Sequence, residues 1–79
     1  MTEALPITAP EVLQNSFRIA WDYLEATGEL VERDLAARFL LDEIEIMMGR
    51  GERRALMLSN RAIDAYRRAR TQRKLALVS

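Results

Sequence analysis

The segment from residue 34 to residue 48 constrains the fold most, because as a helix it is apolar on nearly every side. Its apolar positions are Leu35, Ala36, Ala37, Phe39, Leu40, Leu41, Ile44, Ile46, Met47 and Met48. At about 100° per residue they leave a narrow polar strip made of Asp34, Arg38, Asp42 and Glu45. A helix of this kind belongs in the interior of a structure. The pattern predicts a helix over 34–48, with Asp34 as its N-cap and Gly49 as its stop.

A helix is also predicted over residues 9–26. Thr8 and Glu11 have the spacing of a capping box, and Pro10 is tolerated in the first turn, where its missing N–H would have no partner. The pair Thr27-Gly28 ends the helix, because glycine readily adopts the left-handed backbone conformation. One neighbouring helix cannot cover its apolar arc, which contains Val12, Leu13, Phe17, Ile19, Ala20, Trp21, Tyr23 and Leu24.

The third predicted helix covers residues 52–74. The connection Gly49-Arg50-Gly51 is so short that this helix should lie antiparallel to the preceding one. Its small residues Ser59 and Ala62 would allow a close approach between helices. The sequence therefore predicts an all-α fold, a three-helix hairpin-type bundle in a single domain over residues 1–79, with 1–7 and 75–79 as loosely ordered tails.

The 79-residue chain contains neither cysteine nor histidine. Disulfides are excluded, and the usual ligands of structural zinc are absent. The commonest general base and the strongest nucleophile of enzymes are missing as well, and no serine has a recognisable activating arrangement. The carboxylates around Asp42 and Glu45 are typical of a solvated helix face. We expect no catalytic activity, no cofactor and no metal ion.

Self-association is the expected source of additional stability. A chain of this length removes only about 60% of its unfolded surface from water when it folds. A second copy on the open side of residues 34–48 would complete the bundle, and a monomer with an apolar surface is the alternative. The aromatic Trp21 would anchor either the core or the interface. The residues predicted to form the homodimer interface are Phe17, Trp21, Leu24, Phe39, Leu40, Ile44 and Met47.

The charges divide the chain into two halves. Residues 1–49 carry three arginines against ten acidic residues, and residues 50–79 carry nine basic against two acidic residues. The two halves can neutralise one another, or the basic end can overhang and bind an anionic partner. The residues of that anionic-partner surface would be Arg67, Arg68, Arg70, Arg73 and Lys74. No exposed aromatic residue accompanies them for base stacking, and no glycine-rich phosphate loop is present.

The opening residues, MTEALPITAP, do not have the pattern of a signal peptide, and no apolar run approaches the length of about 20 residues that crosses a bilayer. We therefore expect a cytoplasmic protein without membrane contact.

Three stretches of the sequence resemble those of short, uncharacterised bacterial helical proteins. They are residues 21–25 (WDYLE) with 27–29 (TGE), residues 37–42 (ARFLLD), and residues 51–54 (GERR) with 58–63 (LSNRAI). The resemblance extends over roughly residues 16 to 66 and implies a bacterial origin. It brings no activity, ligand or site residue with it.

From these observations we expect a non-catalytic interaction or adaptor protein that acts as a homodimer. A further protein partner is left open. The alternative is a nucleic-acid binder that contacts phosphates without reading sequence, through the segment from Arg67 to Lys74.

Overall fold

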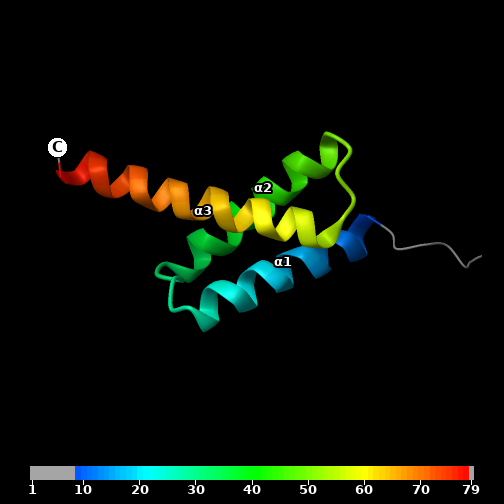
Figure 1. Ribbon diagram of the computed structural model, residues 1–79, viewed down its shortest axis with the longest axis horizontal. Helices are drawn as coiled ribbons and strands as arrows, with labels where there is room; N and C mark the ends of the chain where they lie inside the picture. The colour runs from blue at the N-terminus through cyan, green and yellow to red at the C-terminus, as the bar shows by residue number, and fades with distance from the viewer. Residues whose placement is uncertain (1–8, 79) are drawn as a thin grey trace, which may run out of the picture.

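Three helices packed against one another make up the fold in the computed structural model, which describes the backbone of residues 9–78 and the side chains of residues 10–72. They are α1 (Ala9–Ala26), α2 (Arg33–Gly49) and α3 (Ala55–Val78), and the described range contains no strand. In Figure 1, α2 runs in the opposite direction to α1 and α3. The predicted all-α, three-helix architecture is confirmed.

Helix α1 ends in the way the sequence predicts. Gly28 has a φ of 74°. Its N–H donates to the carbonyl of Glu25, and the N–H of Glu29 donates to the carbonyl of Leu24 at 2.8 Å. These two bonds form a Schellman motif, which satisfies carbonyls that the end of a helix leaves free. Pro10 lies in the first turn, as expected. The predicted capping residue Thr8 lies outside the described residues.

The ends of α2 differ from the prediction. Its N-cap is Glu32, and Asp34 lies inside the first turn. Gly49 is the last helical residue, and the left-handed position belongs to Gly51, with a φ of 104°. The N–H of Gly51 donates to the carbonyl of Met48, so the helix continues through Gly49 until a glycine occupies the position that needs a positive φ.

Helix α3 begins three residues later than predicted. The Glu52 carboxylate accepts hydrogen bonds from the backbone N–H groups of Arg53 and Arg54, at 3.1 and 3.0 Å. The first helical bond then runs from the N–H of Leu58 to the carbonyl of Arg54. Glu52 therefore lies within the connection, which runs on to Arg54, instead of starting the helix. At its other end α3 continues to Val78, so residues 75–78 are helical where a tail was predicted.

The core lies where the three helices meet. Ser16 and Ser59 are buried in it, and their hydroxyls donate to carbonyls of their own helices, Val12 and Leu56 respectively, at 2.8 and 2.9 Å. Both buried hydroxyl groups therefore have a hydrogen-bond acceptor. The buried apolar side chains are Val12, Ala20, Leu24, Ala36, Leu40, Ile44, Leu58, Ala62, Ile63 and Tyr66. Small residues at buried positions allow helices to lie close together.

Helix α3 is the longest of the three. It has 24 residues against 17 in α2, which corresponds to about 36 Å against about 26 Å. Its C-terminal end projects past the other helices (Figure 1). The part that overhangs is shorter than the sequence predicts, since Arg67 and Arg70 contact Glu29 in the connection between α1 and α2.

Candidate functional site

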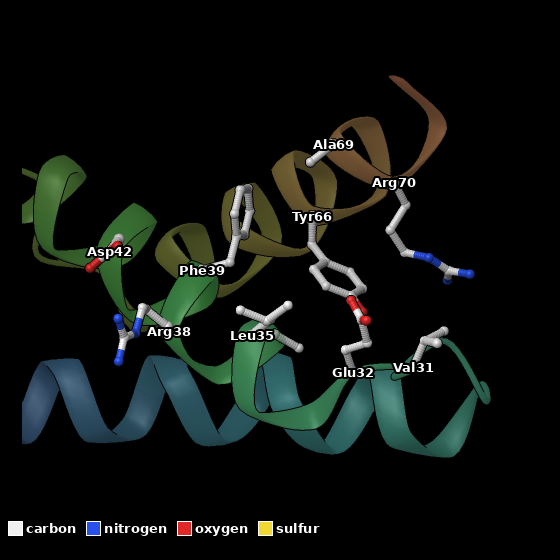
Figure 2. Close-up of a pocket in the computed structure, with 10 residues that line it drawn as sticks. Val31, Glu32, Leu35, Arg38, Phe39, Asp42, Tyr66, Ala69 and Arg70 are labelled. Carbon is white, nitrogen blue, oxygen red and sulfur yellow. The ribbon is translucent and has the colours of Figure 1, made fainter. Parts of the chain in front are cut away.

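An apolar groove between α2 and α3 is the main candidate for a functional site. It has a volume of about 590 Å³. Figure 2 shows the side chains of α2 and the preceding connection on one side and those of α3 on the other. Its apolar lining consists of Val31, Leu35, Ala36, Phe39, Tyr66 and Ala69, and its charged lining of Glu32, Arg38, Asp42 and Arg70.

The floor of the groove is held in place by packing. Phe39 and Tyr66 are in edge-to-face contact, with ring centroids 6.1 Å apart. The Tyr66 hydroxyl donates to the carbonyl of Glu29 at 3.2 Å, and Arg70 lies 6.0 Å from the centroid of the Tyr66 ring. The site is therefore a preformed surface with a rigid aromatic base.

The walls of the groove expose large apolar side chains. Val31 is 63% exposed and Leu35 is 56% exposed. Further along the outward side of α2, Ile46 is 49% exposed. Large apolar side chains that adjoin one another on a surface mark a place where another molecule binds.

Arg38 and Asp42 are two exposed, opposite charges at the edge of this apolar surface. They lie on α2 four residues apart. Among the side chains that the structure describes, neither has a hydrogen-bonding or ionic partner. Both charges remain available to a molecule that covers the groove.

The residues predicted as a dimer interface lie in two environments. Leu24, Leu40 and Ile44 have no exposed surface, because they face the core of their own chain, and they offer nothing to a second copy. Their assignment to the interface is corrected accordingly. Phe17, Trp21, Phe39 and Met47 are partly buried around that core.

Of these partly buried residues, Phe39 is the one that lines the groove. Phe17 and Trp21 stack on each other at 5.4 Å, and Arg33 covers the Trp21 ring at 5.2 Å. The prediction missed Val31, Leu35 and Ile46 as outward-facing positions. Leu35 and Ile46 lie on the side of α2 opposite to Leu40 and Ile44, and Val31 lies in the connection before the helix. The sequence alone does not show which side of α2 faces the core, because apolar residues occur on nearly every side.

The predicted anionic-partner surface is engaged mostly within the chain. Arg67 donates two hydrogen bonds to the Glu29 carboxylate, both at 2.7 Å, and a third to the Tyr23 hydroxyl at 3.2 Å. Arg70 donates to the Glu29 carbonyl at 3.0 Å, and Arg68 forms an ion pair with Asp64 at 2.7 Å. The side chains of Arg73 and Lys74 lie outside the described residues. Glu29 of the acidic half thus neutralises Arg67 of the basic half.

Two carboxylates have strongly lowered pKa values. Hydrogen bonds from Arg67 and then Thr27 lower the pKa of Glu29 from 4.5 to about 2. Hydrogen bonds from the side chain and backbone of Arg54 lower the pKa of Glu52 from 4.5 to about 2. Each glutamate directly follows a glycine with a positive φ. Glu29 ties the connection between α1 and α2 to Arg67 of α3, whereas Glu52 bonds Arg53 and Arg54 within the connection between α2 and α3.

We expect the free energy of unfolding to fall as the pH is lowered from about 4.5 towards 2. The unfolded chain binds a proton on Glu29 near its ordinary pKa of 4.5, whereas the folded chain keeps this carboxylate ionised down to about 2. Urea unfolding followed by circular dichroism at a series of pH values measures the slope. Glu29→Gln should make it shallower without removing it, because Glu52 contributes with the same sign. An unchanged slope in this variant would contradict the role of Glu29.

The described side chains contain no group of three acidic residues arranged to hold a metal ion. Within the part of the chain that the structure describes, no helix combines the length and the apolar character that a membrane crossing requires.

Comparisons of the chain with protein-family models, with curated proteins and with solved structures gave no match.

Proposed function

We propose that this chain is a non-catalytic interaction protein that acts as a homodimer, with the groove between α2 and α3 at the centre of its interface. The observation that carries the proposal is the exposure of Val31 and Leu35 beside the preformed Phe39–Tyr66 floor. Helix α1 packs against both α2 and α3, and the groove is the open side of that helix pair.

A second copy fits this surface for a geometric reason. Two α2–α3 pairs that meet at their grooves form a four-helix layer with an apolar interior, and the two α1 helices lie outside it. An interface of this kind uses the same patch on both copies, as most homodimers do. A small chain gains stability from it because more of its apolar surface is removed from water.

The proposal predicts that Leu35→Asp prevents dimer formation. The substitution places a charge on the exposed apolar wall of the groove, where a second copy would have to desolvate it. Sedimentation velocity at micromolar concentrations should show a dimer for the unaltered chain and a monomer for this variant. Leu56→Asp is the matched control, since Leu56 is 67% exposed but lies outside the groove lining, and this variant should still dimerise.

A monomeric unaltered chain at these concentrations would overturn the homodimer. Nucleic-acid binding is the alternative result to be looked for in the same samples. Binding of mixed DNA and RNA that weakens steeply with salt, and that is lost when Arg67, Arg68, Arg70 and Arg73 are replaced by glutamine, would replace the present proposal.

A further inference from the structure

We infer that the two copies pack α2 against α2 in antiparallel orientation, about a two-fold axis at the level of residue 40, so that Arg38 of each copy pairs with the partner's Asp42. The inference rests on the proposed homodimer and specifies its geometry. It is carried by two of the exposed charges on α2, Arg38 and Asp42, which line the groove, and by the positions of the apolar residues around them.

The charges are placed to pair with another copy. Arg38 precedes Asp42 by one helical turn, and this order is the less favourable one for an ion pair within a helix. Neither residue has a partner among the described side chains. Both line the groove, so a molecule that fills the groove would cover them. Covering unpaired charges is costly, and the occupant must therefore bring the opposite charge to each of them.

A second copy brings these charges in antiparallel orientation. About a two-fold axis at the level of residue 40, position 38 of one helix lies opposite position 42 of the other, and the same contact occurs twice. A parallel pair in register would instead bring arginine to arginine and aspartate to aspartate, which is repulsive. The charge pattern alone therefore selects the direction of the second helix.

The apolar residues fit the same register. At 1.5 Å per residue, Leu35 lies about 7.5 Å below the level of residue 40 and Ile46 lies about 9 Å above it. The antiparallel arrangement therefore sets Leu35 beside the partner's Ile46. Phe39 lies only about 1.5 Å from the level of the two-fold axis, so it comes close to Phe39 of the second copy. These three side chains share one side of α2, within about 40° of one another, next to Arg38 and Asp42.

Oppositely charged pairs at the edge of an apolar interface also give the dimer a defined register. Apolar side chains alone tolerate a shift of one helix along the other, whereas the two Arg38–Asp42 pairs form in a single position. The contribution of such pairs is mainly to specificity.

Charge exchange tests this geometry directly. Arg38→Asp and Asp42→Arg each produce a homodimer with two like-charge contacts. The dimer affinity of each variant alone should therefore be lower than that of the unaltered chain by a factor of about 10 or more. In an equal mixture of the two variants, an all-acidic pair meets an all-basic pair, and a heterodimer of near-normal affinity should form. The double variant Arg38→Asp/Asp42→Arg should also dimerise normally. Sedimentation equilibrium and native mass spectrometry measure these affinities and compositions.

Arg61→Asp is the control, because Arg61 is exposed on α3 and does not line the groove; this variant should dimerise normally. Recovery on mixing also shows that the single variants are folded. If the unaltered chain dimerises but the single variants dimerise equally well, or if mixing restores nothing, the antiparallel register is wrong while the homodimer stands. If the unaltered chain is a monomer, the homodimer fails and the register fails with it.

Discussion

We expect the replacement of Leu40 by alanine to lower the free energy of unfolding by about 2 to 5 kcal/mol. Leu40 has no exposed surface and belongs to the buried cluster, on the inward side of α2. The substitution removes apolar atoms from the core and leaves a cavity that rigid neighbouring helices fill only in part. Urea unfolding followed by circular dichroism measures the loss, at one fixed protein concentration because dimer formation would make the midpoint depend on concentration.

The matched control for this prediction is Leu56→Ala. Leu56 is 67% exposed and is also helical, so the change in helix propensity is the same in both variants. The difference between the two losses therefore reports burial alone. We expect Leu56→Ala to change the free energy of unfolding by less than about 0.5 kcal/mol. Equal losses in the two variants would show that Leu40 is not in the core.

The ends of α1 could be predicted from the sequence because the signals there are local. Pro10 fits the first turn, and Gly28 closes the last one through hydrogen bonds within residues 24–29. The end of α2 has two candidate glycines, Gly49 and Gly51, and the sequence does not distinguish them. In the structure Gly51 takes a positive φ and Gly49 does not.

The inward side of α2 could not be predicted, for a physical reason. Periodicity identifies a buried face by contrast with a polar one, and in residues 34–48 that contrast is almost absent. Leu35 and Leu40 are chemically identical, yet one is 56% exposed and the other is fully buried. Contacts with α1 and α3 decide between them. The predicted interface therefore includes core residues such as Leu40 and omits Leu35, which lines the groove.

The sequence predicts that arginines pair with acidic residues, but it does not predict which residues form the pairs. The charge distribution indicates that the basic half can neutralise the acidic half. The particular pair of Arg67 with Glu29 depends on the rotation of α3 about its axis and on the Gly28 turn, which places Glu29 beside α3. The Gly28 turn has a local signature in the sequence, whereas the rotation of α3 is a tertiary feature and has none.

The second large effect on stability is expected at Ser59, a small residue buried where α3 packs closely against its neighbours. Replacing Ser59 by leucine should lower the free energy of unfolding by about 1 to 3 kcal/mol, because a larger side chain must enter a site that is already filled. Ser59 has no exposed surface, and its hydroxyl is satisfied by the Leu56 carbonyl. The loss would therefore come from overpacking and not from a missing hydrogen bond to another helix. Urea unfolding of the variant measures it.

The neighbouring residue provides the control for this substitution. Asn60 is exposed on the same helix, so Asn60→Leu adds a side chain of the same shape where there is space for it. Both substitutions replace a weaker helix former by leucine, so the gain in helix propensity is similar in the two variants. If Ser59→Leu proves no less stable than Asn60→Leu, α3 does not lie close to its neighbours at this point. A clear difference instead means that the buried serine sets the distance at which the helices pack.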